Sequence, residues 1–187
     1  RRSSDLGDPC SKARISEMFD VLNQITVDAL LSPKSDGERE LAATHYLKLM
    51  ENDLMLLDRG YEGFWVFQLI LARGADFCAR VSLNRLKVVQ KFIGSGDYDR
   101  TITLASTPHS ARKCAELGID SKPFKIRLIR VRLSTGETEV LVTSLLDREK
   151  YPAELFADLY QLRWPIEEDY KILKSRIQIE RFSGKTV

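Results

Sequence analysis

Four side chains near the C-terminal end of the sequence have the types and spacing that suit phosphate chemistry. They are separated by 3, 4 and 7 residues, and they are Tyr160, Arg163, Glu167 and Lys174. On one continuous helix, this spacing places a phenol, a guanidinium, a carboxylate and an ammonium group on a single face. A guanidinium binds phosphate with two parallel hydrogen bonds, and an ammonium binds it as a point charge. The alternative is a solvated helix face, since Arg163 and Glu167 are spaced as an ordinary ion pair.

A second acidic candidate, Asp58, follows an apolar run far upstream. Residues 54–57 read Leu-Met-Leu-Leu, which is typical of a central strand buried on both faces. A glycine turn and an apolar stretch from Phe64 follow, so this segment predicts a strand, a turn and a helix. In open α/β sheets, sites form at the carboxyl ends of strands. The alternative is that Asp58 only caps the following helix.

These two segments together resemble the bacterial transposases of the insertion-sequence-4 type. The residues from Tyr160 to Lys174 match the Y-(2)-R-(3)-E-(6)-K signature of that family, including the Trp164 and Ile166 between them. The tip Asp58-Arg59-Gly60-Tyr61 also resembles the family and occurs in the same order along the chain. The similarity extends over residues 14–185.

The resemblance implies an α/β fold of the ribonuclease-H-like class. In this fold a mixed sheet is flanked by helices, and a β-rich insertion precedes the last catalytic helix. Residues 1–187 are then a single transposase catalytic domain whose N-terminal strand is missing, and residues 77–148 are the insertion within it.

The resemblance also implies a metal-binding triad of two aspartates and one glutamate. Asp58 matches the second aspartate and Glu167 the glutamate, so both are expected to be catalytic and to bind two Mg²⁺ or Mn²⁺ ions. Two such cations stabilise the attacking and the leaving oxygen when a phosphodiester bond is cut, and they prefer oxygen ligands. The expected DNA contacts are Tyr160, Arg163, Lys174 and Lys171.

The first aspartate of the triad has no clear counterpart in this sequence. Asp5 and Asp8 lie in a stretch of Gly, Ser and Pro, and Asp20 is at a position that the resemblance does not assign to the triad. We therefore expect a fragment truncated at both ends, impaired or inactive by itself, of a longer protein that is an enzyme for DNA transposition. The alternatives are a ribonuclease-H-like nuclease and a catalytically inactive DNA-binding remnant of a transposase.

The expected partners are double-stranded DNA, as transposon ends and as target, and a second copy of the protein in the complex that pairs the ends. The charge distribution agrees: residues 15–76 carry 5 basic and 11 acidic side chains, residues 80–132 carry 12 and 4, and residues 171–187 carry 5 and 1. No apolar run approaches the length of a membrane span, and no signal peptide is visible. Three widely spaced cysteines with two histidines fit no zinc motif and are expected to be buried or idle thiols in a bacterial cytoplasm.

The local patterns predict the elements that position these residues. Short strands are expected at 25–27 and 29–31, a helix ending near Met50, a strand at 54–57 and a helix from Phe64 to about Gly74. Short β-type runs follow at 77–81, 87–93 and 101–104, and then a long hairpin of 124–133 with 138–145. An amphipathic helix is expected over 152–162, with a break near Pro165, because proline lacks the amide donor that a helix requires.

Overall fold

A computed structural model describes residues 13–33, 35–83, 87–132 and 136–176, with side chains from Arg14 to Lys171 within these ranges. Its strands are β1 (Ala13–Asp20), β2 (Ile25–Pro33), β3 (Leu54–Leu57), β4 (Asp76–Val81), β5 (Asp99–Leu104), β6 (Phe124–Arg132) and β7 (Thr138–Thr143). Its helices are α1 (Glu38–Tyr46), α2 (Phe64–Ala72), α3 (Lys87–Gly94), α4 (Pro108–Glu116), α5 (Leu155–Gln161) and α6 (Pro165–Arg176), with a short 3₁₀ turn η1 (Arg59–Tyr61).

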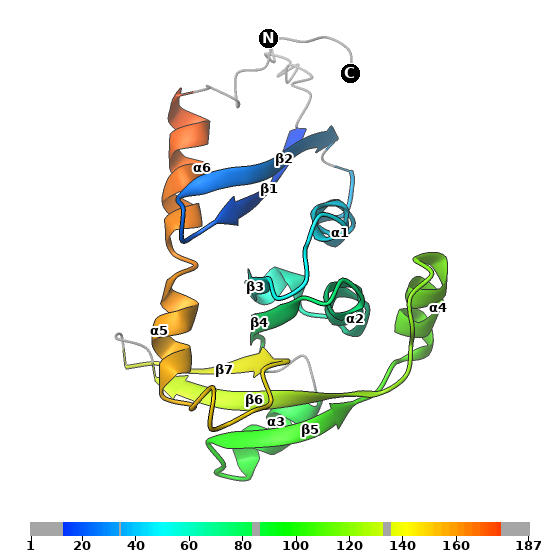
Figure 1. Cartoon of the computed structure of the whole chain (residues 1–187), viewed down its shortest axis with the longest axis vertical. Helices are drawn as coiled ribbons and strands as arrows, with labels where there is room; N and C mark the ends of the chain where they lie inside the picture. The colour runs from blue at the N-terminus through cyan, green and yellow to red at the C-terminus, as the bar shows by residue number, and fades with distance from the viewer. Residues whose placement is uncertain (1–12, 34, 84–86, 133–135, 177–187) are drawn as a thin grey trace, which may run out of the picture.

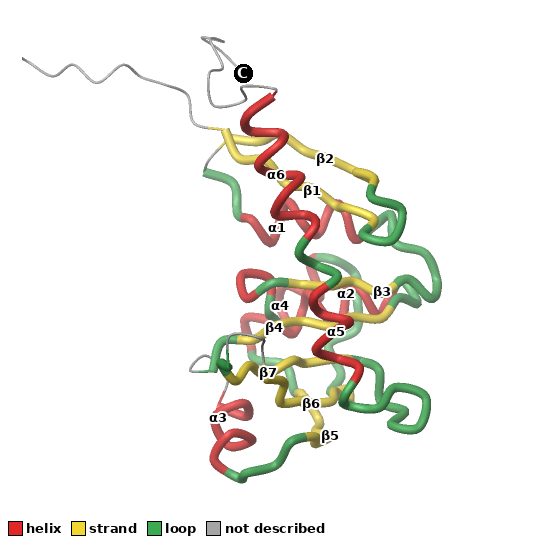
Figure 2. The backbone as a smooth tube through the Cα atoms, turned by 90° about the vertical axis from the view of Figure 1, so that its left-hand side faces the viewer, coloured by secondary structure: helices red, strands yellow, loops and turns green. Residues whose placement is uncertain are grey.

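The described strands form two separate sheets. β1 and β2 make an antiparallel pair, and the other five strands make a mixed sheet in the order β3-β4-β7-β6-β5. In the larger sheet β3 and β4 run parallel, while the remaining neighbours are antiparallel. The hairpin and α1 lie at one end of the molecule and the larger sheet at the other (Figure 1). Helices α5 and α6 follow each other along one side and span both parts (Figure 2).

Several sequence predictions are confirmed in this architecture. The apolar run 54–57 is strand β3, the stretch from Phe64 is helix α2, and the predicted long hairpin is β6 with β7. The expectation that 54–57 is a central strand buried on both faces was wrong for the described residues, because β3 lies at the edge of its sheet and three of its four residues are only partly buried. Helix α5 ends at Gln161 and α6 begins at Pro165, so the proline interrupts the helix as expected. Tyr160 therefore lies in α5, Arg163 in the turn that follows, and Glu167 and Lys174 in α6.

Other local predictions were wrong. The two short strands expected at 25–27 and 29–31 are one strand, β2, because Asp28 between them is no turn residue but an ion-pair partner of Lys48. The run 87–93 belongs to helix α3 and is not a strand, because Val89 and Phe92 are three residues apart and are buried together on one helix face. Helix α1 ends at Tyr46, earlier than the predicted Met50.

The region predicted as a β-rich insertion, residues 77–148, contains strands and helices. It includes β4 to β7 but also α3 and α4. β4 pairs directly with β3, so the region continues the sheet that carries Asp58. Its boundaries as an insertion stay a prediction.

The main core lies between α2 and the larger sheet. α2 is apolar around most of its circumference, and six of its nine residues are buried. Phe67 of α2 stacks on Phe77 of β4 with ring centroids 4.2 Å apart. Cys78 and Cys114 are buried free thiols, as predicted, whereas Cys10 lies outside the described residues. This packing holds β3 and β4, and therefore the strand ends that carry the candidate site.

A buried charge connects the sheet to α5. The Arg127 side chain is fully buried, and its Nε and Nη2 donate to the two carboxylate oxygens of Asp99 at 2.9 and 2.7 Å. Nη1 donates to the Tyr151 carbonyl at 2.6 Å, and the guanidinium lies 5.3 Å from the centre of the Phe156 ring. Because Phe156 belongs to α5, this ion pair positions the helix that leads into the catalytic signature.

A second buried polar group, His45, connects α1 to the hairpin. Its Nδ1 lies 2.7 Å from Asp28 and its Nε2 lies 3.0 Å from Ser16 Oγ. His45 therefore has a structural role. Within the part of the chain that the structure describes, no helix has the length and apolar character needed to cross a membrane.

Candidate active site

Asp58 lies at the carboxyl end of β3, where it caps η1. Its Oδ1 accepts hydrogen bonds from Arg59 N at 2.7 Å and from Arg80 Nε and Nη2 at 3.0 and 2.7 Å. The parallel register pairs Leu57 with Ala79, which places Arg80 of β4 beside Asp58. Among the described residues, no hydrogen bond reaches Asp58 Oδ2. A capping role for Asp58 is therefore compatible with a role as a metal ligand, because the cap uses only the Oδ1 oxygen.

The surroundings of Asp58 favour its charged form. Burial raises the pKa of this carboxyl, but the Arg59 amide, the charge of Arg163 and the hydrogen bonds and charge of Arg80 lower it by more. The pKa of Asp58 consequently lies below its ordinary value. A carboxylate that stays deprotonated at neutral pH is the form that binds a cation.

Tyr160 is buried between α5 and the sheet. Its hydroxyl donates to the Leu57 carbonyl at 3.2 Å and lies 3.5 Å from Asp58 Oδ1. Burial raises the pKa of the phenol far above its ordinary value, so it stays a neutral donor. In this structure, Tyr160 holds the end of β3 against α5, and its predicted contact with DNA is not tested.

The second carboxylate, Glu167, forms an ion pair with Arg163 and lines the same cavity as Asp58. Arg163 Nη2 donates to Glu167 Oε1 at 2.6 Å, four residues apart across the break between α5 and α6. The Arg163 guanidinium lies 5.6 Å from the centre of the Tyr160 ring, and its Nε is buried without a partner among the described residues. Asp58, Arg163 and Glu167 line one cavity of about 730 Å³. The fold thus places two carboxylates that are 109 residues apart in the sequence along the lining of one cavity.

Two charged side chains at this site, Arg80 and Glu139, were missed by sequence reasoning, and Arg59 was named only as part of the tip motif. Arg59 forms an ion pair with Glu139 of β7, and Arg80 Nη1 lies 3.6 Å from the same Glu139 oxygen. The Glu139 side chain is only 4% exposed. The sequence could have indicated Arg80, because it lies near the end of the strand after β3 and the carboxyl ends of adjacent parallel strands meet at one edge of a sheet. No sequence pattern indicates Glu139, because its antiparallel strand is placed beside β4 only by the order of the strands in the sheet.

The remaining predicted residues lie outside this centre or outside the described side chains. Lys171 is exposed on α6 and donates to Glu168 at 2.5 Å, which raises the pKa of the lysine. Lys174 is on α6, but its side chain is outside the described part. Asp20, the last residue of β1, lines the cavity, and its oxygens accept hydrogen bonds from the backbone and side chain of Asn23 in the turn that follows. Asp5 and Asp8 lie outside the described residues.

The oxygen donors at the site are of the type that a hard divalent cation prefers, but they are fewer than a complete ligand set. Asp58 and Glu167 provide carboxylate oxygens on one cavity, and Asp58 Oδ2 accepts no hydrogen bond from a described residue. No group of three His, Cys, Asp or Glu residues placed to hold a metal occurs in the described ranges. A cation bound by these two carboxylates would need further oxygen ligands from water or DNA.

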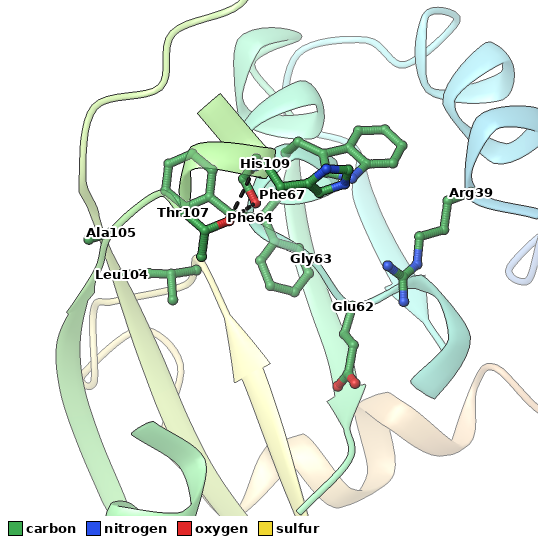
Figure 3. Close-up of a pocket in the computed structure, with 11 residues that line it drawn as sticks. Arg39, Glu62, Gly63, Phe64, Phe67, Leu104, Ala105, Thr107 and His109 are labelled. Carbon is green, nitrogen blue, oxygen red and sulfur yellow. Dashed lines mark hydrogen bonds between the residues drawn. The ribbon is translucent and has the colours of Figure 1, made fainter. Parts of the chain in front are cut away.

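A smaller cavity lies at the start of α2 and has a different character (Figure 3). It has a volume of about 170 Å³ and lies between the start of α2 and the β5–α4 connection. Its carboxylate, Glu62, accepts a hydrogen bond from the Ser82 amide at 2.8 Å, and Thr107 caps α4 through the Ser110 amide at 3.2 Å. His109 is exposed at its edge. In these interactions, Glu62 and Thr107 bind backbone amides.

The fold and site define an α/β protein whose candidate site combines carboxylates with arginines. The chain belongs to the transposase DDE domain family, whose model matches residues 15–187. This assignment confirms the resemblance seen in the sequence.

Several curated transposases are similar to this chain. It is 23% identical over 184 residues to the transposase InsG for insertion sequence element IS4 of Escherichia coli K12, a match that covers 97% of this chain and 41% of InsG. It is 30% identical over 133 residues to the putative transposase y4zB of Sinorhizobium fredii, covering 69% of this chain and 35% of that protein. The putative transposase InsL for IS186A of E. coli K12 is 29% identical over 86 residues, covering 46% of this chain and 23% of InsL. The chain therefore spans less than half the length of these relatives.

Proposed function

We propose that this chain is the larger part of a ribonuclease-H-like catalytic domain that cuts and joins DNA at the ends of a mobile element. The observation that carries the proposal is the shared cavity of Asp58 and Glu167, with Arg163 linked to both. Membership of the transposase DDE domain family supports DNA transposition as the process. The predicted pairing of two copies of the protein stays a prediction.

The proposed chemistry is an in-line exchange at phosphorus. A water oxygen bonds to the phosphorus while the bond to the 3′-oxygen breaks, which leaves a 3′-hydroxyl and a 5′-phosphate. In strand transfer, the 3′-hydroxyl attacks a phosphorus of the target and displaces another 3′-oxygen. A divalent cation, when bound, stabilises negative charge on the attacking and leaving oxygens. Asp58 and Glu167 would hold it.

The arginines have separate roles in this proposal. Arg80 and the Arg59 amide fix the orientation of Asp58 through Oδ1, so that Oδ2 stays available. Arg163 has a buried Nε without a described partner, and it is the group best placed to receive a phosphate oxygen. Tyr160 fixes the strand end through the Leu57 carbonyl.

A cleavage and joining assay tests the proposal. The chain and a longer polypeptide that contains it are each incubated with Mn²⁺, a labelled duplex of the DNA that borders the element, and an unlabelled target duplex. We expect new 3′-hydroxyl ends and joined products with the longer polypeptide, and neither when Mn²⁺ is removed by a chelator. Cleavage without joining indicates a nuclease, and failure of both reactions would contradict the proposal.

A second candidate, DNA binding without catalysis, is favoured by one observation. The described residues provide two carboxylates at the site rather than three that could hold a metal. This candidate predicts that the longer polypeptide binds the duplex but leaves it uncut. The same assay therefore separates the two candidates.

Loss of the Lys171 charge is expected to weaken DNA binding to the same extent for every sequence tested. Lys171 is exposed on α6, next to the helix start that carries Glu167. If it contacts one phosphate, Lys171→Gln reduces the slope of log affinity against log salt concentration by about 0.9. The measurement is fluorescence anisotropy with a labelled duplex at several salt concentrations. Lys150→Gln, at an exposed lysine beside Tyr151, is the control and should keep the slope.

A further inference from the structure

Glu139 is a buried carboxylate at the sheet edge that carries Asp58. It is the second residue of β7, and the residue after it, Val140, pairs with Val81 at the end of β4. Because β7 is antiparallel to β4 and β4 is parallel to β3, the start of β7 lies at the edge where β3 and β4 end. Sheet order therefore brings this carboxylate to the candidate site.

One oxygen of Glu139 contacts two arginines of the site. Its Oε1 accepts a hydrogen bond from Arg59 Nη2 and lies 3.6 Å from Arg80 Nη1. The other two nitrogens of the same Arg80 guanidinium, Nε and Nη2, donate to Asp58 Oδ1 at 3.0 and 2.7 Å. A single guanidinium therefore connects Glu139 to the candidate metal ligand.

The burial of Glu139 is costly, and the two arginines do not require it. A buried carboxylate loses its hydration, and ion pairs often recover no more than that loss. Its Oε2 is also buried without a hydrogen-bond partner among the described residues, which costs further free energy. Arg59 is half-exposed and Arg80 is paired with Asp58, so neither guanidinium would be buried and unpaired without Glu139. An acid at this position therefore indicates a role other than stability.

The charges around Asp58 cancel only when Glu139 is counted. Ion pairs and short-range charge interactions connect three arginines with three carboxylates, which are Arg59, Arg80, Arg163, Asp58, Glu139 and Glu167. Three positive and three negative charges leave this group of six neutral, whereas the five without Glu139 carry a net charge of +1. A net positive charge disfavours a divalent cation and favours a phosphate at the same place.

We propose that Glu139 is a positioning residue of the metal site. It offsets the charge of Arg59 and Arg80 and holds Arg80 against Asp58, so that the site receives a divalent cation at Asp58 rather than a phosphate. Glu139 acts through the two arginines and is not itself a ligand. This inference rests on the proposed function, because it requires that Asp58 binds a cation.

Binding measurements with Glu139→Gln test this inference without a cleavage reaction. Glutamine keeps the size of the side chain and an oxygen that can accept from Arg59, but it removes the charge. Mn²⁺ affinity is measured by water-proton relaxation, and affinity for a labelled DNA duplex in the presence of a chelator is measured by fluorescence anisotropy. The matched control is Glu116→Gln, which removes an exposed acidic charge from α4, on the opposite side of the molecule from α5 and α6 (Figure 1).

We expect Glu139→Gln to weaken Mn²⁺ binding by about tenfold and to strengthen duplex binding by about threefold, because one added positive charge acts in opposite directions on the two ligands. Glu116→Gln should leave Mn²⁺ affinity within about twofold, because solvent and salt screen a distant exposed charge. Weaker binding of both ligands by Glu139→Gln would overturn the inference, since a carboxylate that only stabilises the fold affects both in the same direction. An unchanged Mn²⁺ affinity, or an equal change in Glu116→Gln, would also overturn it.

A second pair of variants tests Glu139 even if Glu139→Gln alone does not fold. Arg59→Gln and Glu139→Gln together remove both charges of one ion pair, so no buried charge is left behind. Relative to Arg59→Gln alone, we expect the double substitution to bind Mn²⁺ about tenfold more weakly. Equal Mn²⁺ affinities of these two variants would contradict the inference alone, whereas absence of Mn²⁺ binding in the unmodified chain would contradict the proposed function and the inference together.

Discussion

Exchange of Asp58 for asparagine is expected to slow Mn²⁺-dependent DNA cleavage by about a thousandfold or more. Asparagine keeps the size of the side chain and an oxygen that accepts from the Arg59 amide, but it loses the charge that holds a cation. A cation at such a site provides several kcal/mol of transition-state stabilisation, and about 4 kcal/mol corresponds to roughly a thousandfold in rate. The measurement is the single-turnover cleavage rate of the longer polypeptide.

The control for this substitution is Asp97→Asn, which removes a carboxylate that forms an exposed ion pair with Arg100. It should leave the cleavage rate within about twofold, because isolated surface pairs contribute little. A cleavage rate for Asp58→Asn within threefold of the unmodified protein would show that Asp58 is no metal ligand.

Glu167→Gln should produce a similar loss for the same reason, but it also frees Arg163 from its ion pair. Mn²⁺ binding separates these two effects. We expect Glu167→Gln to weaken Mn²⁺ binding in a water-relaxation titration, whereas a purely structural role for Glu167 would lower stability and leave Mn²⁺ affinity intact. Circular dichroism identifies a variant that has failed to fold.

Removal of the Asp99 carboxylate is expected to lower the free energy of unfolding by about 3 kcal/mol. Asp99→Ala leaves the fully buried Arg127 guanidinium without its bidentate partner, and breaking a buried ion pair from one side costs about 3–5 kcal/mol. Arg148→Ala is the matched control, because Arg148 binds the same carboxylate from an exposed position and its loss should cost less than about 1 kcal/mol. Denaturant unfolding measures both. Equal effects of the two substitutions would contradict the role of the buried pair.

The same ion pair makes stability depend on pH in a defined direction. Burial raises the pKa of Asp99, but the hydrogen bonds and charges of Arg127 and Arg148 lower it by a larger amount. The pKa of Asp99 in the folded state therefore lies below its value in the unfolded state. The contribution is therefore complete above the unfolded pKa of about 3.9 and is lost as the pH falls through the folded value. The stability difference between the unmodified chain and Asp99→Ala should shrink as the pH falls below about 4.

Local patterns in the sequence were enough to predict most of the elements that hold the candidate residues, whereas the catalytic roles expected for Asp58 and Glu167 came from the resemblance to the transposase family. The apolar run 54–57, the glycine turn after it and the apolar helix from Phe64 each carry their own short-range signal. Pro165 breaks the signature helix for a local reason, the missing amide donor. The spacing of Tyr160, Arg163 and Glu167 was likewise readable without knowledge of the fold.

Only the tertiary structure decided what surrounds these residues. Sheet order determines that Arg80 reaches Asp58 and that Glu139 reaches Arg80. Strand pairing depends on partners that the alternation of side chains does not identify. The helical state of α3 was decided by burial of Val89 and Phe92 rather than by β-branched composition. The apolar sequence of β3 is typical of a strand with a neighbouring strand on each side, whereas within the described residues β3 pairs with β4 alone. Which strands become neighbours is decided by contacts across the molecule and not by the sequence of one strand.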